Sequence, residues 1–153
     1  EPTDLAAVAR EATEPLSGHQ RVRLVHELAP LAPVPADREA VLRVVQNLVT
    51  NAVEAIEGQG TITVKTYEEP GWAVVSVADT GCGIPEDFLR NSLFAPFRTT
   101  KKGGWGVGLY QARTAIEGHG GRIEVTSRQG EGTTFWIKLP KTPPSGVAPE
   151  VSR

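Results

Sequence analysis

The feature that most constrains the fold is a long helical pattern with one apolar face, which starts after Asp37 and ends before Gly58. Aspartate is a common N-terminal cap and glycine a common helix stop, so both boundaries have a physical cause. The apolar residues recur at the spacing that places side chains on one face of a helix. They are Val41, Val45, Leu48, Ala52 and Ala55. Such a helix buries its apolar face, and the strand patterns that follow predict a sheet as its partner.

The N-terminal part of the chain predicts one helix and one strand before this central helix. Asp4 is placed to cap a helix that begins at Leu5, and Gly18 is expected to end it. Residues 21–28 are rich in valine and leucine and alternate in part, which predicts a strand. Three prolines between residues 30 and 35 predict a turn-rich, irregular connection, because proline lacks the N–H that regular structure uses.

The second half of the chain predicts two strand pairs separated by a helix. Residues 61–67 and 72–78 have strand patterns and are joined by a short turn, which is typical of an antiparallel hairpin. Residues 107–117 predict a helix, and residues 122–127 and 133–139 predict the last two strands. The order is helix, strand, helix, two strands, helix, two strands, without an internal repeat, so the fold class is α/β.

The length of 153 residues fits one domain, which we place at residues 1–140. After Pro140, the proline-rich segment 141–153 has too few apolar side chains to order itself, so we expect a disordered tail. The net charge of −2 gives no electrostatic reason to expect a nucleic acid as a partner.

Cysteine, histidine and hydropathy exclude further classes of protein. Cys82 is the single cysteine, which rules out an internal disulfide, and the three histidines are too scattered for a zinc site. No apolar run approaches the roughly 20 residues that cross a bilayer, and the N-terminus lacks a signal-peptide pattern. We therefore expect a cytoplasmic domain, whose parent protein is either soluble or membrane-anchored.

Two asparagines, Asn47 and Asn51, interrupt the apolar pattern of the central helix. Positions four apart share a helix face, so both carboxamides are predicted to point the same way. Asparagine disfavours a helix interior by several tenths of a kcal/mol, which favours a compensating contact. A carboxamide oxygen is a hard, neutral ligand suited to Mg²⁺. The alternative is that both asparagines, and Glu54 on the same stripe, are solvated surface residues.

Asp79 ends an apolar strand pattern and is followed by Gly81 and Gly83. An ionised aspartate only accepts hydrogen bonds, so it suits an exocyclic amine such as that of adenine. The two glycines let the backbone pass close to a flat ring or take a positive φ. The alternative is an aspartate that merely caps the turn.

A glycine-rich loop with Gly104, Gly106 and Gly108 precedes the last predicted helix. A loop and not a strand comes before it, which argues against a dinucleotide fingerprint, and the sequence has no P-loop motif. The loop instead feeds the first turn of a helix, where free N–H groups and the helix dipole favour phosphate. The run from Arg98 to Lys102 adds cations and hydroxyls that can bind phosphate, although a solvated basic loop is the alternative.

Four motifs follow one another along the chain: Asn47-x-x-x-Asn51, Asp79-x-Gly81-x-Gly83, Phe94-x-Pro96-Phe97 and Gly104-x-Gly106-x-Gly108. This ordered set resembles the N, G1, F and G2 boxes of the catalytic ATP-binding domain of bacterial sensor histidine kinases. That domain belongs to the GHKL superfamily, which includes gyrase, heat-shock chaperone and mismatch-repair ATPases.

The resemblance extends from Asp4 to Pro140 and includes two closing elements, His119-Gly120-Gly121 and Gly132-Thr133-Thr134-Phe135. The segment Thr99-Thr100-Lys101 looks most like the nitrogen-regulator subgroup. Arg98 departs from that pattern, because the subgroup usually has a second phenylalanine there.

The resemblance implies a two-layer α/β sandwich, in which helices cover one face of a mixed sheet. It also implies that Mg-ATP binds under a mobile lid, with Asn51 on Mg²⁺, Asp79 on the adenine amine and Thr133 in the water network around adenine. Asn47, Asn51 and Lys101 are the implied catalytic residues. The implied nucleotide-binding residues are Asn51, Asp79, Gly81, Gly83, Ile84, Phe97, Arg98, Thr99, Thr100, Lys101, Gly104, Gly106, Val107, Gly108, Leu109 and Thr133.

Asn47 distinguishes between the activities known in the superfamily. Its ATPases carry a glutamate general base four residues before the magnesium asparagine, and this chain has Asn47 there. Asparagine cannot accept a proton near neutral pH, so we expect transfer of the ATP γ-phosphate to a protein histidine. A nucleotide-sensing regulatory module and an ATPase without phosphotransfer are the alternatives.

A histidine kinase also needs a phosphoacceptor, and His26 is followed by Glu27 and Pro30. The family's acceptor motif has one more residue between the acidic residue and the proline and lies on a long dimerisation helix, whereas His26 falls in a predicted strand. We therefore expect the acceptor on a separate dimerisation domain of the same or a sister chain, and a response regulator downstream. We expect this domain to be monomeric and its parent to be a homodimer.

Overall fold

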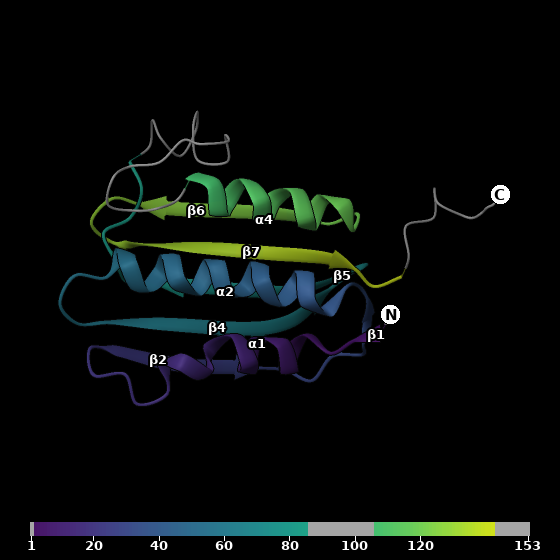
Figure 1. Cartoon of the computed structure of the whole chain (residues 1–153), viewed down its shortest axis with the longest axis horizontal. Helices are drawn as coiled ribbons and strands as arrows, with labels where there is room; N and C mark the ends of the chain where they lie inside the picture. The colour runs from purple at the N-terminus through teal and green to yellow at the C-terminus, as the bar shows by residue number, and fades with distance from the viewer. Residues whose placement is uncertain (1, 86–105, 143–153) are drawn as a thin grey trace.

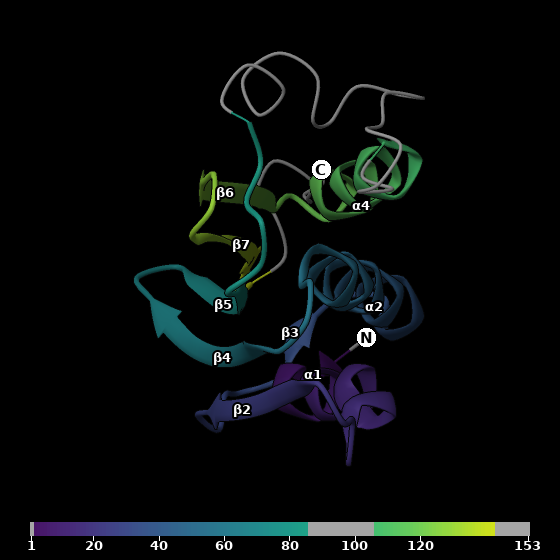
Figure 2. The ribbon, with the colours of Figure 1, turned by 90° about the vertical axis from the view of Figure 1, so that its left-hand side faces the viewer.

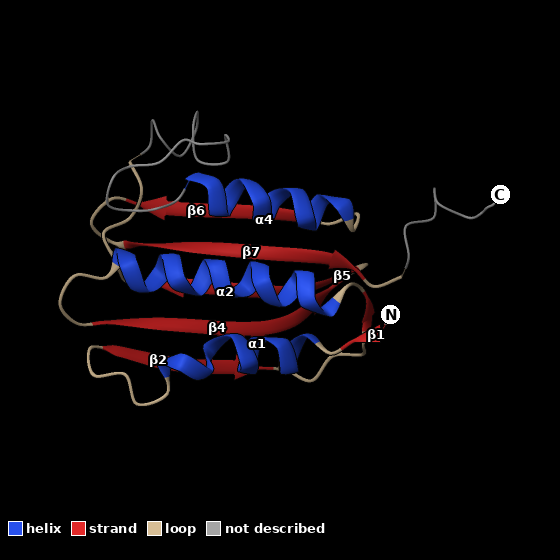
Figure 3. Ribbon diagram, in the orientation of Figure 1, coloured by secondary structure: helices blue, strands red, loops and turns tan. Residues whose placement is uncertain are grey.

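The computed structural model describes residues 2–85 and 106–142, which form two layers. Helices α1 (Leu5–Thr13), α2 (Arg38–Ala55) and α4 (Gly106–Gly118) lie side by side over one face of a sheet (Figures 1 and 2). Figure 3 shows that strands make up the whole of the second layer. The predicted two-layer α/β sandwich is confirmed.

The sheet has five strands in the order β2-β4-β5-β7-β6. They are β2 (Val22–Leu28), β4 (Gly60–Glu69), β5 (Trp72–Asp79), β6 (Arg122–Arg128) and β7 (Gly132–Pro140). Strands β2 and β4 are parallel, and the other neighbours are antiparallel, so the sheet is mixed. A parallel pair needs a long crossover, and α2 provides it.

The core fills the space between the helices and the inner face of the sheet. The five apolar residues that predict the inner face of α2 are all buried. Strand β7 alternates buried and half-buried residues along its length, with Phe135, Ile137 and Leu139 facing the helices. Asp4 and Asp37 cap α1 and α2 through their carboxylates, which confirms both predicted helix starts.

The structure corrects two predictions in the N-terminal part of the chain. Helix α1 ends at Thr13, before Gly18, because Pro15 turns the chain into a short 3-10 helix, η1 (Glu14–Leu16). The proline-rich connection is not wholly irregular, since β3 (Val34–Pro35) pairs with β1 (Pro2–Thr3) in a two-stranded antiparallel sheet. Two-residue edge strands tolerate proline because few ladder N–H groups are needed.

Parts of two predictions lie outside the described residues. They are the basic run and the start of the glycine-rich loop, which fall within residues 86–105, and the tail from residue 143 onward. In the part of the chain that is described, no helix combines the length and the apolar character that a membrane span requires.

Candidate functional site

Asn51 lies in the last turns of α2 and is turned toward the interior, with 8% of its surface exposed. Its amide nitrogen Nδ2 is buried and has no hydrogen-bond partner among the described residues. Leaving such a group unpaired costs about 1–3 kcal/mol. The described contacts within the fold do not explain why a polar side chain is buried here, so the position of Asn51 favours a contact with a ligand.

Asp79 ends β5, at the same end of the molecule as the last turn of α2. The N–H of Gly81 donates to its Oδ1 at 2.7 Å, and the backbone N–H of Thr133 on β7 favours the ionised carboxylate. Asp79 therefore caps the turn, as the alternative interpretation had it. A carboxylate has about four acceptor positions, so the bond from Gly81 leaves capacity for a further donor.

Burial perturbs the acidity of Asp79. Loss of solvation raises the pKa of its carboxyl group to about 6, although the two backbone donors oppose the change. At pH 7 the group is still mostly ionised and remains an acceptor. A perturbed carboxylate at the end of a strand is typical of a functional site.

The glycine loop after Asp79 passes between α2 and the turn that joins β6 to β7. A Cβ atom on Gly81 would lie 2.6 Å from the carbonyl oxygen of Ala55, the last residue of α2. Gly83 has a φ of +77°, and a Cβ there would lie 2.3 Å from the carbonyl oxygen of Arg128. Both positions require glycine, because only glycine fits so close to another backbone.

Two backbone hydrogen bonds fix this loop. The N–H of Cys82 donates to the carbonyl oxygen of Ala55 at 2.9 Å, and the N–H of Gly130 donates to the carbonyl oxygen of Cys82 at 2.7 Å. The loop therefore ties the helix that carries Asn51 to the hairpin that faces Asp79.

Ser127 is a residue of this region that the sequence interpretation missed. Its Oγ donates to the carbonyl oxygen of Gly132 at 3.0 Å and accepts the N–H of Ile84 at 2.8 Å. Because its one proton is used, the Thr133 hydroxyl donates to Ser127 Oγ across 2.7 Å. The β6–β7 hairpin pairs residue 127 with residue 133, so its register could have identified Ser127 as the neighbour of Thr133.

A polar hollow of about 340 Å³ opens beside Asp79. Thr133 and Ser127 line it together with the β6–β7 turn. The hollow and the glycine loop bring together Asp79, Gly81, Gly83 and Thr133, four of the residues that the resemblance implies for nucleotide binding. Ile84 is buried under the loop, with 2% of its surface exposed.

The first turn of α4 contains the predicted phosphate-binding residues Gly106, Val107, Gly108 and Leu109. Leu109 is fully buried. A helix start presents N–H groups without partners inside the helix, which favours an anion. The predicted residues Phe97, Arg98, Thr99, Thr100, Lys101 and Gly104 lie outside the described residues.

Asn47 is half-buried and does not share the surroundings of Asn51. It lines a groove of about 620 Å³ between α1 and α2, beside Leu16 and Val53. Glu54 is exposed and borders the same groove. The two carboxamides are one helical turn apart, but only that of Asn51 is buried.

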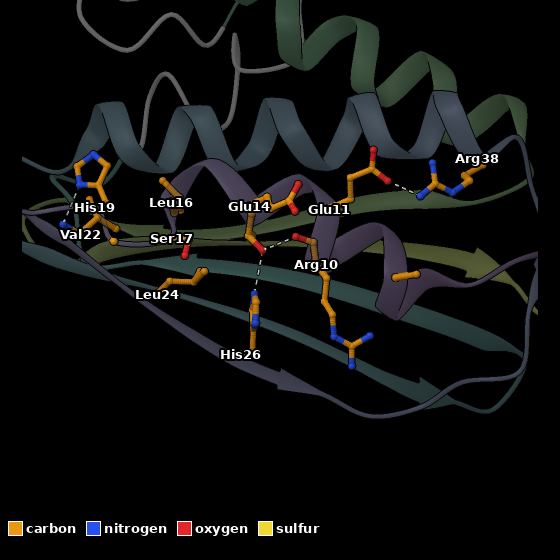
Figure 4. A pocket seen from close by; sticks show the side chains of 13 residues that line it. Arg10, Glu11, Glu14, Leu16, Ser17, His19, Val22, Leu24, His26 and Arg38 are labelled. Carbon is orange, nitrogen blue, oxygen red and sulfur yellow. Dashed lines mark hydrogen bonds and ion pairs between the residues drawn. The ribbon is translucent and has the colours of Figure 1, made fainter.

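A larger groove of about 870 Å³ lies between α1 and β2 (Figure 4). Arg38 and Glu11 form an ion pair at its rim, and His26 Nε2 lies 2.8 Å from Thr13 Oγ1. Burial and the nearby Arg10 lower the pKa of His26, which lies in β2 as predicted. These polar groups bind one another, so we place the functional site at Asp79 and Asn51 and not in this groove.

Comparison with known proteins identifies the family. Residues 36–143 match the family described as "Histidine kinase-, DNA gyrase B-, and HSP90-like ATPase", and so cover most of the chain. The chain belongs to this ATPase family. Within it, the relatives of this ATPase domain are sensor histidine kinases, and it is an ATP-binding catalytic domain of the histidine kinase type.

Among the relatives of this ATPase domain is the signal transduction histidine-protein kinase AtoS of Escherichia coli strain K12. The two are 40% identical over 125 residues, which cover 80% of this chain and 20% of AtoS. The ATPase domain therefore spans about a fifth of the length of that relative.

Solved structures of histidine kinases have the same fold. The nucleotide-free catalytic domain of ThkA is 34% identical, with a TM-score of 0.80 over 94% of this chain and 99% of that one. ThkA in complex with the response regulator TrrA is 32% identical, with a TM-score of 0.78 over 94% and 42%. Full-length ShkA in complex with AMPPNP is 27% identical, with a TM-score of 0.80 over 94% and 31%.

Proposed function

We propose that this domain binds Mg-ATP and transfers the γ-phosphate to a histidine on a separate dimerisation domain, in two-component signalling. The observation that carries the proposal is the arrangement of Asn51 and Asp79. Among the described residues, the buried Asn51 amide nitrogen has no hydrogen-bond partner, and the Asp79 carboxylate keeps acceptor capacity. The two groups lie at the two sides of one glycine loop. ShkA, which has the same fold, was solved with the ATP analogue AMPPNP.

Asp79 is proposed to accept a hydrogen bond from the exocyclic amine of adenine. Its partial burial makes such a bond stronger than it would be in water, because the local dielectric constant is lower. The Ser127–Thr133 hydroxyl pair lies beside the carboxylate and is placed to hold water next to the base. A guanine base has no amine at the corresponding position, so we expect selectivity for ATP over GTP.

The residues present fit a magnesium ion that arrives with the phosphates. In the described ranges, no group of three or more His, Cys, Asp or Glu side chains is placed to hold a metal ion. The Asn51 carboxamide is the ligand that we propose, and the burial of its Nδ2 without a partner among the described residues supports a ligand contact here. Magnesium neutralises charge on the phosphates when it binds. Its remaining ligands would be phosphate oxygens of the nucleotide and water.

The chain's own residues supply positioning. In phosphoryl transfer, correct placement and charge stabilisation account for most of the catalysis. The first turn of α4 is proposed to bind phosphate oxygens through its free N–H groups, and Lys101 with the neighbouring Arg98, Thr99 and Thr100 is proposed to do so from the lid. Asn47 cannot act as a general base, which favours a protein nucleophile over water.

The partners are proposed to be a dimerisation domain that carries the acceptor histidine and a response regulator. ThkA, which shares this fold, was solved with a response regulator. We propose that the parent is a homodimer and that this domain alone is a monomer.

The test supplies γ-labelled ATP and Mg²⁺ together with a dimerisation domain that carries a histidine. We expect the label to appear on that domain as acid-labile phosphohistidine, and a His→Ala acceptor is the control. Tight ATP binding without any transfer would favour a nucleotide sensor. Fast release of free phosphate without an acceptor would favour an ATPase. Either result would overturn the proposed kinase function.

A further inference from the structure

His119 joins the end of α4 to the start of α2. Its Nε2 accepts the backbone N–H of Asp37 at 3.1 Å, and its Nδ1 lies 2.8 Å from the carbonyl oxygen of Ala115. Asp37 is the N-cap residue of α2, and His119 follows the last residue of α4. This contact therefore links the two helices through residues that are 82 positions apart in the sequence.

The two contacts determine the tautomer of the ring. A backbone N–H can only donate, so Nε2 must carry a free lone pair. A carbonyl oxygen can only accept, so Nδ1 must carry the proton. His119 is thus a neutral imidazole with both nitrogens engaged, one within its own helix and one across to α2.

The two glycines after His119 explain why the side chain can occupy this place. Gly120 has a φ of +80°, and the N–H of Gly121 returns to the carbonyl oxygen of Ile116 at 3.0 Å, which closes the helix end. A Cβ on Gly121 would lie 2.2 Å from the carbonyl oxygen of Lys138. The turn is therefore pressed against β7, and His119 is held toward α2.

The contact lies at the opposite end of α2 from Asn51. The helices α2 and α4 run antiparallel and side by side (Figure 1), so the start of α4 adjoins the end of α2. Asn51 lies fourteen residues after Asp37, which corresponds to about 21 Å along the helix. The side chains that α4 buries are apolar: Leu109, Ala112 and Ile116. Apolar packing is not directional, so it permits sliding that a hydrogen bond opposes.

We propose that His119 is a positioning residue for the nucleotide site, because its hydrogen bond to Asp37 sets how α4 lies along α2. The first turn of α4 and Asn51 of α2 are two sides of the site put forward above, so this inference rests on the proposed function. His119 touches no nucleotide. It acts through the relative placement of the two helices.

Asparagine and glutamine at position 119 separate the two hydrogen bonds. The Asn amide reaches the position of Nδ1, so His119→Asn keeps only the bond to Ala115. The Gln amide reaches the position of Nε2, so His119→Gln keeps an acceptor for the Asp37 N–H. We expect the Kd for Mg-ATP, measured by calorimetry, to rise about threefold to tenfold in His119→Asn. We expect it to stay within about twofold of wild type in His119→Gln.

His26→Ala is the matched control, since it also removes one histidine hydrogen bond, to Thr13, but at the far edge of the sheet. It is expected to leave the Kd unchanged. Loss of stability alone cannot raise the Kd, because a protein with a normal stability of about 5–15 kcal/mol stays folded after losing one hydrogen bond. Circular dichroism at the assay temperature checks that each variant is folded.

The outcomes separate this inference from the function on which it rests. Weaker binding in His119→Asn with rescue in His119→Gln supports the positioning role. Equal affinity of the wild type and His119→Asn overturns the positioning role and leaves the proposed function intact. Equal weakening in both variants shows that the bond to Asp37 is not the cause and also overturns it. No ATP binding by the wild type overturns the proposed function and this inference together.

Discussion

Replacing Asp79 with asparagine should make the nucleotide-free domain more stable at neutral pH, and the gain should depend on pH. Burial raises the pKa of this carboxyl from 3.8 to about 6 in the folded protein. Well below pH 3.8 the group is protonated in both the folded and the unfolded chain. Between pH 4 and 6 the unfolded chain releases its proton while the folded chain keeps it, so the free energy of unfolding falls as the pH rises.

The size of the effect follows from the change in pKa. Each pKa unit corresponds to about 1.4 kcal/mol, so the full difference is about 3 kcal/mol. Asp79 is only partly buried, and water screens part of this cost, so we expect about 1–3 kcal/mol. The carboxamide in Asp79→Asn has no charge at any pH, and its oxygen can still accept the N–H of Gly81.

Urea unfolding of the wild type and Asp79→Asn at intervals from pH 4 to pH 7.5 measures this difference. The variant should gain stability relative to the wild type as the pH rises, and the gain should level off above about pH 7. Asp79→Ala is the control, because it also lacks the charge but loses the acceptor. The free energy of unfolding of Asp79→Ala should depend on pH in the same way as that of Asp79→Asn, but should be lower at every pH. A difference between wild type and Asp79→Asn that is constant with pH would refute the reasoning.

Three further substitutions test the site and its scaffold. Asn51→Leu removes a buried amide nitrogen that has no partner among the described residues, so the nucleotide-free domain should be equally stable or gain about 1 kcal/mol in urea unfolding. Mg-ATP binding, measured by calorimetry, should be lost. A loss of stability would contradict this reasoning. Gly83→Ala should cost more than about 2 kcal/mol in the same unfolding assay, because the new Cβ meets backbone 2.3 Å away at a positive φ. Gly58→Ala has a similar φ of +75° with nothing within 4 Å, so it should cost only about 1 kcal/mol, and equal costs would rule out the backbone contact as the cause. The Arg21 guanidinium donates to the carbonyl oxygens of Ile56 and Gly58, just after α2, at 2.8 and 3.0 Å. Arg21→Ala removes both bonds and should lower the free energy of unfolding by about 1–3 kcal/mol in thermal or urea unfolding. The control Arg23→Ala changes an exposed arginine and should not show this loss.

Local patterns predicted most of the fold. The caps Asp4 and Asp37, the apolar face of α2 and the β4–β5 hairpin depend on neighbouring residues, so the sequence alone identified them. Local sequence patterns could not predict the order of the strands in the sheet. The pairing of β2 with β4 is parallel and joins segments across α2, and only long-range packing decides it. The resemblance to a known family, and not periodicity, supplied the two-layer arrangement with a mixed sheet, without a strand order.

The sequence predicted some parts of the candidate site correctly and missed others, and each outcome has a physical reason. Asp79 and its glycines are adjacent in the sequence, and the structure keeps them together. Asn47 and Asn51 appeared equivalent at i and i+4, yet a helix turns about 40° beyond a full turn over four residues, and only Asn51 is buried. Ser127 was missed because the sequence interpretation did not work out the register of the β6–β7 hairpin, which places Ser127 opposite Thr133.

The most direct test of the central claim is an NMR titration of the isotope-labelled domain with AMPPNP, a non-hydrolysable ATP analogue, in the presence and absence of Mg²⁺. The account predicts that the backbone amide of Gly81 shifts with the nucleotide, and that the side-chain amide of Asn51 shifts further when Mg²⁺ is added. Resonances of Thr13 and His26, in the groove between α1 and β2, should remain unchanged. Shifts confined to that groove, with Gly81 and Asn51 unaffected, would contradict the proposed site.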